Sequence, residues 1–210
     1  MSDVAHAHRS LLYCRAMKNT EKSPRANGFK VIGLTGQPLS GKDTAAGFFV
    51  MKGFAHFSCG DILREEMRKQ GLPVDRAHTG PFATKMKQER GNAYLAELAA
   101  EKVTGNAVIS GLRAALEVEA LHQRFGDDFI LLCIDAPIED RYERAQKRGR
   151  EGDHITFEEF RRIEENERSD ASGALEVDKV IALADRHIDN SGTIDGLYAQ
   201  LATLLGASKA

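Results

Sequence analysis

The sequence predicts an α/β protein with three layers, in which a five-stranded parallel sheet is covered by helices on both faces. Five short apolar segments alternate with segments compatible with helices, and these apolar segments are residues 30–35, 54–58, 107–110, 129–134 and 187–188. Residues 129–134 are apolar at every position, as expected for a strand buried on both faces of a parallel sheet. Ligands of such sheets bind beyond the carboxyl ends of the strands, so functional residues are expected there.

Turn and capping residues predict the helices. Gly71 and Pro73 end the helix that follows the second strand, Pro137 opens another near its first turn, and Thr156 with Glu159 forms a capping-box pattern. Helices are expected at residues 42–51, 61–70, 81–103 with a break near 91, 114–124, from 137 onward, from 156 onward and, after a turn at 190–192, up to 205.

The composition of the 210-residue chain is that of an ordinary globular protein. Its 29 basic residues nearly balance its 31 acidic residues, so it lacks the basic excess of a protein built mainly to bind nucleic-acid phosphates, and nucleic acid is not expected as a partner. The apolar run at residues 129–134 is far shorter than the about 18 residues needed to cross a bilayer. We therefore expect no membrane span.

The cysteines indicate the redox state of the compartment, and the N-terminal segment indicates where the domain begins. Cys14, Cys59 and Cys133 are odd in number and widely separated, so neither a disulfide framework nor a zinc knuckle is expected, and a reducing cytoplasm fits best. Residues 1–28 lack the apolar core of a secretory signal and are expected to form a flexible tail before one domain at residues 29–210. The oligomeric state cannot be predicted from these patterns.

Residues 36–44 read G-Q-P-L-S-G-K-D-T and contain the G-x-x-x-x-G-K pattern of a phosphate-binding loop, the P-loop or Walker A motif. Backbone N–H groups of such a loop surround phosphates, the following helix adds its positive end, and the lysine offers a charge to the β and γ phosphates. The predicted strand before the loop and helix after it are the context that the motif requires. Nucleotide binding is therefore expected at Gly36, Ser40, Gly41, Lys42, Asp43 and Thr44.

The loop departs from its usual pattern directly after the lysine. A Ser or Thr there normally offers a hydroxyl to Mg²⁺, whereas this chain has Asp43, with Thr44 one position later and about 100° further around the helix. The Asp43 carboxylate is a hard oxygen donor that Mg²⁺ accepts. Stabilisation of the helix N-terminus by a first-turn acid is an equally good interpretation.

With the segment S-C-G-D-I-L-R at residues 58–64, the loop resembles those of P-loop kinases of small nucleotide-like substrates, specifically the dephospho-CoA kinase and adenylate kinase group. The resemblance spans about residues 30–205 and implies the P-loop NTPase fold, with ATP, Mg²⁺ and a small nucleotide substrate. It implies that Asp61 organises Mg²⁺-bound water or the acceptor hydroxyl, and that Arg64 binds the acceptor phosphate. The alternative is that Asp61 only caps a helix and Arg64 is a surface charge.

The segment V-I-S-G-L-R at residues 108–113 resembles the group's third-strand signature, in which an apolar run ends in an acid followed by Gly and a phosphate-binding Arg. Ser110 stands where the group often has Asp, so support for Mg²⁺ is expected from Asp61 or Asp43. An Arg just beyond a strand can grip phosphate with two parallel hydrogen bonds, which favours Arg113 as a phosphate ligand. The alternative is an exposed charge at a helix start.

Residues 141–155 are rich in arginine and resemble the lid of dephospho-CoA kinases, with Gly149 and Gly152 as flexible points. The spacing of Arg144 and Arg148 places both on one face of a helix, where the resemblance implies that they stabilise the transferred charge. A solvated basic face or an RNA-contacting patch is the competing interpretation.

The segment I-D-N-S-G at residues 188–192 resembles the turn beside the nucleotide base in the same group, which implies base contacts at Asn190 and Gly192. A tight turn that caps the last helix explains the same residues equally well.

These patterns favour an ATP-dependent kinase acting on a nucleoside monophosphate or dephospho-CoA, with catalytic roles for Lys42, Asp61, Arg113, Arg144 and Arg148. The alternative is a nucleotide-binding regulatory protein or weak ATPase, which the departures at Asp43 and Ser110 motivate. No Asn-Lys-x-Asp segment occurs, so guanine-specific GTPases are disfavoured.

Overall fold

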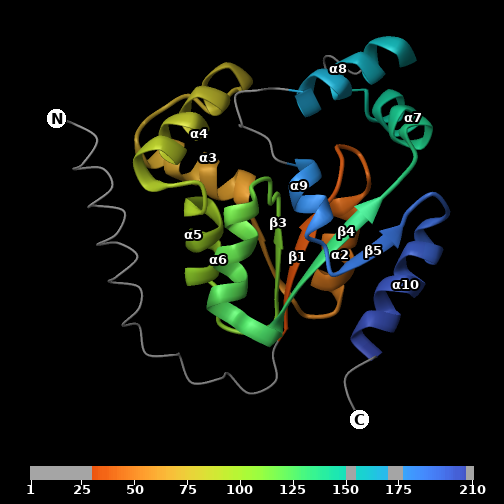
Figure 1. The fold of residues 1–210 in the computed structure, drawn as a ribbon, viewed down its shortest axis with the longest axis horizontal. Coiled ribbons are helices and arrows are strands. Elements are labelled where there is room, and N and C mark those ends of the chain that lie inside the picture. The colour runs from red at the N-terminus through yellow and green to blue at the C-terminus, as the bar shows by residue number, and fades with distance from the viewer. Residues whose placement is uncertain (1–29, 150–154, 170–176, 207–210) are drawn as a thin grey trace.

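A computed structural model describes residues 30–149, 155–169 and 177–206. These residues form one parallel sheet in the order β2-β3-β1-β4-β5, which confirms the predicted fold class (Figure 1). The strands are β1 Val31–Thr35, β2 Ala55–Ser58, β3 Ala107–Ser110, β4 Phe129–Asp135 and β5 Arg186–Asp189. All five lie within two residues of the predicted segments. The expected tail at residues 1–28 lies outside the described residues.

The helices follow the strands in the alternation that the sequence predicts. They are α2 Lys42–Met51, α3 Cys59–Lys69, α4 Arg76–Arg90, α5 Tyr94–Glu101, α6 Ala115–Phe125, α7 Ile138–Arg148, α8 Phe157–Ser169, α9 Val177–Ala182 and α10 Ile194–Gly206, with a 3-10 turn at Gly126–Asp128. None of the described helices is long and apolar enough to cross a membrane.

Two differences from the expected helices have local causes. The expected helix at residues 81–103 does break at Gly91, but its first part begins earlier, at Arg76, because the Asp75 side chain accepts a hydrogen bond from the backbone N–H of His78 and caps that turn. Pro81 is accommodated inside α4. The short helix α9 was not predicted, since six residues carry too little periodicity to identify a helix.

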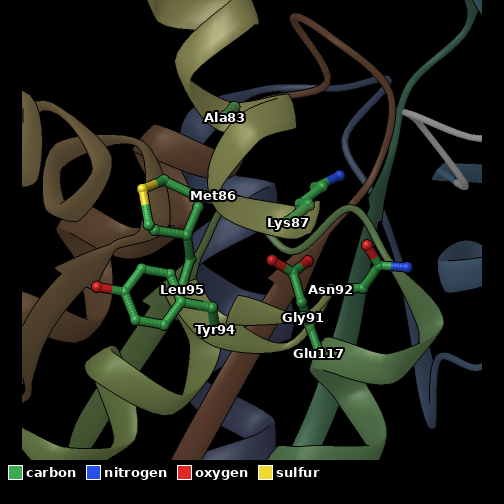
Figure 2. Close-up of a pocket in the computed structure, with 8 residues that line it drawn as sticks. All are labelled: Ala83, Met86, Lys87, Gly91, Asn92, Tyr94, Leu95 and Glu117. Atoms are coloured by element: carbon green, nitrogen blue, oxygen red, sulfur yellow. The ribbon is translucent and has the colours of Figure 1, made fainter. Parts of the chain in front are cut away.

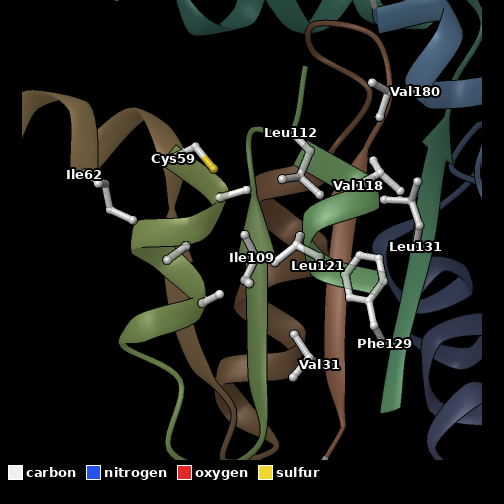
Figure 3. Packing of buried hydrophobic residues seen from close by; sticks show 13 residues of the cluster. Val31, Cys59, Ile62, Ile109, Leu112, Val118, Leu121, Phe129, Leu131 and Val180 are labelled. Carbon is white, nitrogen blue, oxygen red and sulfur yellow. The ribbon is translucent and has the colours of Figure 1, made fainter. Parts of the chain in front are cut away.

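Side chains alternate between the two faces of the sheet and build two cores. On one face Ile32, Leu34 and Leu132 pack against α2 and α10. On the other face Val31 and Leu131 pack against α3, α5, α6 and α9, as Figure 3 shows. The central strands β1, β3 and β4 are thereby buried along most of their length, which positions the loops that follow them.

Candidate active site

The loop between β1 and α2 has the backbone conformation that its glycines permit. Gly36 has φ 135° and Gly41 has φ 104°, both in the region that favours glycine. A Cβ at Gly36 would lie 2.3 Å from the carbonyl oxygen of Ile134, and one at Gly41 would lie 2.1 Å from Asn190 Nδ2. A side chain at Gly36 would displace the backbone of β4, and one at Gly41 would displace the Asn190 amide, so both positions favour glycine.

Lys42 lies at the start of α2 with its ammonium group folded back over the loop. Its Nζ donates hydrogen bonds to the carbonyl oxygens of Gly36 at 2.9 Å and Gln37 at 2.7 Å. Burial is the main cause that lowers the pKa of Lys42 to about 8, and the nearby charges of Arg113 and Arg141 lower it further, whereas Asp43 and Cys133 oppose the shift. An anion bound over the loop would stabilise the charged form of the Lys42 ammonium.

Side chains from distant parts of the chain hold the loop through hydrogen bonds to its carbonyl oxygens. Asn190 is buried and donates from Nδ2 to the Ser40 carbonyl at 2.7 Å. Arg144 donates to the carbonyls of Leu39 and Ser40, both at 3.2 Å, and to that of Asn190 at 2.5 Å. These bonds fix the loop before any ligand binds, which is the preorganisation that phosphate binding requires.

One buried hydroxyl of the loop tests whether a phosphate group fits there. The Ser40 Oγ is buried, and within the described part of the chain it has no hydrogen-bond partner. A buried hydroxyl without a partner is costly, so a ligand with acceptor oxygens would stabilise it. Together with the Lys42 ammonium and the N-terminus of α2, this donor set fits a nucleotide's phosphates.

The two residues expected to serve the acceptor lie on the first turns of α3. Asp61 and Arg64 form an exposed ion pair at 2.5 Å. Asp61 does not cap the helix, because the Ser58 hydroxyl accepts the hydrogen bond from the Asp61 backbone N–H at 3.3 Å. The capping interpretation of Asp61 is therefore wrong, and its carboxylate is available to solvent beside a guanidinium.

Arg113 follows β3 with an exposed side chain. Its backbone N–H donates to the buried carboxylate of Glu117 at 2.6 Å, and that of Ala114 does so at 2.9 Å, so Glu117 fixes the start of α6. Burial raises the pKa of Glu117. At the end of β3, the Ser110 Oγ lies 2.8 Å from His56 Nε2, where the resemblance places an acid.

The remaining expected site residues differ in how exposed they are. Asp43 is exposed on the first turn of α2, and Thr44 beside it is half-buried. Arg148 is exposed at the end of α7, and Gly192 is exposed in the turn before α10. The carboxylates that could hold Mg²⁺, Asp43 and Asp61, are both accessible to a hydrated ion. Part of the expected lid, residues 150–154, lies outside the described residues.

Sequence reasoning missed an ion pair that ties the arginine-rich helix to its neighbour. Arg141 is buried and forms a bidentate pair with Glu164 of α8, with a 3.0 Å bond from its Nη2. It also donates to the carbonyls of Ala136 at 3.0 Å and Pro38 at 3.5 Å. Glu164 is one of five glutamates in α8, so the sequence does not reveal which of them pairs with Arg141.

A second group that the sequence did not reveal lies between the last part of β4 and the first half of β5. Cys133 is buried and donates from Sγ to Asp135 Oδ1 at 3.1 Å, and His187 Nδ1 lies 2.6 Å from Asp135 Oδ2. Burial is the main cause that raises the pKa of the Cys133 thiol, and the bond to Asp135 raises it further. Only the register of the two strands brings these residues together.

A small hollow lies away from the loop, between α4, α5 and α6. Met86, Tyr94 and Leu95 line its apolar side, and Lys87 and Glu117 line its polar side (Figure 2). Its free volume is on the scale of one water molecule, so it cannot hold a nucleotide.

Comparison with known sequences identifies the group to which this chain is similar. Residues 35–161 match the family model of an AAA domain, AAA_17. A UPF0200 protein of Methanosarcina mazei is 34% identical over 170 residues, which cover 79% of this chain and 88% of that protein. A UPF0200 protein of Thermococcus kodakarensis is 32% identical over 182 residues, which cover 83% and 96%. The chain spans 55% of a longer UPF0200/UPF0201 protein of Archaeoglobus fulgidus, with 32% identity.

Solved structures share the fold. TT1252 from Thermus thermophilus aligns with a TM-score of 0.58 and 16% identity, over 88% of this chain and all of that one (100%). A shikimate kinase from Bacteroides thetaiotaomicron aligns with a TM-score of 0.56 and 14% identity, over 85% of this chain and 99% of that one. The likeness at these identities is one of fold, that of P-loop kinases.

Proposed function

The chain belongs to the UPF0200 family and contains an AAA domain, and from this premise we propose that it is an ATP-dependent phosphotransferase acting on a nucleotide or nucleotide-containing metabolite. The observation that carries the proposal is the preorganised loop, whose carbonyls are already bonded to Asn190 and Arg144 and whose lysine ammonium is half-buried above it. An anion of several charges is the ligand that this arrangement favours.

Each group has a role in this proposal. Lys42 neutralises the donor phosphates, and Arg113 and Arg148 stabilise charge on the transferred group. Arg144 holds the loop in its binding conformation through its bonds to the carbonyls of Leu39 and Ser40, and its positive charge also favours a bound anion. Asp43 or Asp61 provides carboxylate oxygens for Mg²⁺, which when bound neutralises phosphate charge.

The acceptor in this proposal is a nucleoside monophosphate or dephospho-CoA. The Arg64 guanidinium, already 45% exposed beside Asp61, supports a monophosphate, because it offers a bidentate site for a second phosphate. The test is ATP consumption with Mg²⁺ across nucleoside monophosphates and dephospho-CoA, with shikimate as a comparison acceptor and Lys42→Ala as the background. ATP consumption that no nucleoside monophosphate or dephospho-CoA stimulates, or that only shikimate stimulates, would contradict the proposal.

Arg64→Ala tests the choice of acceptor. We expect a loss of kcat/KM of at least tenfold with a monophosphate acceptor and little change with dephospho-CoA, because only the former would need that guanidinium. Arg68→Ala, an exposed arginine on the same helix, is the matched control. Equal effects of the two variants on every acceptor would mean that Arg64 does not read the acceptor phosphate.

A second candidate is a nucleotide-binding regulatory protein or weak ATPase. The observation that favours it is the hydrogen bond of Ser110 to His56 at the strand end, where the kinase group carries a carboxylate. This candidate predicts tight ATP binding with little dependence on Mg²⁺ and no loss in Arg113→Ala. Acceptor-dependent turnover that is abolished in Lys42→Ala would exclude it.

A further inference from the structure

Three side chains with different metal-binding atoms gather in the last part of β4 and the adjacent first half of β5. Cys133 and His187 are partners in the parallel register of these strands, and Asp135 lies two residues beyond Cys133. Side chains two residues apart on a strand point to the same face, and so do register partners on adjacent strands. The parallel pairing of β4 and β5 therefore places a thiol, a carboxylate and an imidazole on one face of the sheet.

The donor atoms are close enough to share one ion. Cys133 Sγ, a carboxylate oxygen of Asp135 and a ring nitrogen of His187 all lie within 4.8 Å of one another. A tetrahedral Zn²⁺ ion with bonds of about 2.0–2.3 Å separates its ligand atoms by about 3.3–3.8 Å. The present separations of 3.1 Å (Sγ to Oδ1) and 2.6 Å (Oδ2 to Nδ1) differ from that range by less than about 1 Å, so side-chain rotation suffices.

The chemistry of the set selects the ion. A thiolate with an imidazole and a carboxylate suits Zn²⁺, whereas Mg²⁺ and Ca²⁺ prefer oxygen ligands alone. The sulfur is buried, but the side chains of Asp135 and His187 are 45% and 53% exposed, so an ion can enter from solvent and keep one water ligand.

We propose that Cys133, Asp135 and His187 form a Zn²⁺ site with three protein ligands and one position open to water. Binding forms a Zn–S bond as the S–H bond of Cys133 breaks, and the proton leaves to solvent without any change of oxidation state. The site adjoins the phosphate-binding loop, because Cys133 is also the register partner of Thr35, the residue directly before Gly36. It does not depend on the proposed phosphotransfer.

Co²⁺ titration of the chelator-treated, reduced full-length chain tests the site. We expect one ion per chain and a thiolate-to-cobalt charge-transfer absorption that Zn²⁺ displaces. Each cysteine is then changed in turn: the absorption should vanish in Cys133→Ser and remain in Cys14→Ser and Cys59→Ser. No such absorption in the unmodified chain, or its loss with Cys14 or Cys59 instead, would overturn the assignment.

Two exposed ligands keep the test decisive if the buried Cys133→Ser variant fails to fold. His187→Ala and Asp135→Asn should each weaken Zn²⁺ binding at least tenfold by competition with a chromophoric chelator. His122→Ala, an exposed histidine of α6, and Asp189→Asn, the register partner of Asp135, should leave it unchanged. Unchanged affinity in both ligand variants would mean that the three side chains form only a hydrogen-bonded chain.

Discussion

Among single residues, Lys42 gives the clearest indication of the ligand, through its hydrogen bonds and its lowered pKa. Its ammonium donates to two loop carbonyls, yet burial and the charge of Arg113 hold its pKa at about 8, well below the ordinary 10.5. Bound phosphates would stabilise the charged form and raise that pKa again. Ligand binding and proton uptake are therefore coupled at this residue.

The coupling predicts how ATP affinity depends on pH. Below pH 8 the lysine of the free protein is already charged, so affinity is flat; above pH 8 binding must take up a proton, and affinity falls. Between pH 7.5 and pH 9 we expect a loss of up to about eightfold for a non-hydrolysable ATP analogue measured by calorimetry.

Lys42→Arg is the matched control for this pH dependence, because a guanidinium stays charged throughout the range. Its affinity should not change between pH 7.5 and pH 9, whatever its absolute value. The same slope in the unmodified chain and in Lys42→Arg would assign the proton to another group.

Residue patterns also explain which site residues could be predicted. Gly36, Gly41 and Lys42 lie in one continuous motif, so local sequence predicts them. Asn190 was expected near the base or in a turn, but its side chain donates to the Ser40 carbonyl 150 residues away. No local pattern encodes that contact, because it depends on how β5 docks beside β1 through β4.

At the scale of elements, α7 is the support that joins the loop to α8. Arg144 bonds the loop carbonyls from the middle of α7, and Arg141, one turn earlier, pairs with Glu164 inside the molecule. The arginine-rich pattern predicted a helix with two guanidiniums on one face. The partners show that α7 supports the loop, and that α8 packs on α7 through this buried ion pair and through ring contacts of Tyr142 with Phe157 and Phe160.

Breaking that pair should loosen α8. Glu164→Ala leaves a buried guanidinium without its carboxylate, and we expect a loss of about 3 kcal/mol in the free energy of unfolding, measured with urea. Glu165→Ala, on the exposed side of the same helix, should cost about 0–1 kcal/mol.

Replacing both members of the ion pair by apolar side chains separates the contribution of the charges to stability from that of packing. The double variant Arg141→Met with Glu164→Leu removes both charges, and we expect it to recover much of the stability that Glu164→Ala loses. Equal losses in the single and double variants would mean that Arg141 acts through its bonds to Ala136 and Pro38 rather than through the pair.

In the whole molecule, the order of the strands determines which candidate site residues lie beside the loop. β1 is the central strand, flanked by β3 and β4, so the loop after it lies between the end of β3 with Arg113 and the ends of β4 and β5. Helices pack on both faces of the sheet (Figure 1). Ligands of such sheets bind at the carboxyl edge, where the loop follows β1.

A ligand that binds only this folded arrangement must stabilise it. An ATP analogue at 100 times its Kd should add about 2.7 kcal/mol, which corresponds to a rise in Tm of roughly 5–10 °C for a chain of this size. Differential scanning calorimetry measures the shift. Lys42→Met should show a much smaller one, and an equal shift in both chains would indicate binding elsewhere.

Local sequence patterns were enough to predict the alternation of strands and helices, the phosphate-binding loop and the capping box of Thr156 with Glu159. The reciprocal bonds of that capping box are formed at 2.9 Å and 3.3 Å. Each of these features depends on interactions between residues close together in the chain. The register pairing of Cys133 with His187, the bond of Asn190 to the loop and the partner of Arg141 became visible only in the folded chain. Those contacts follow from strand register and helix docking, which depend on the packing of the whole core.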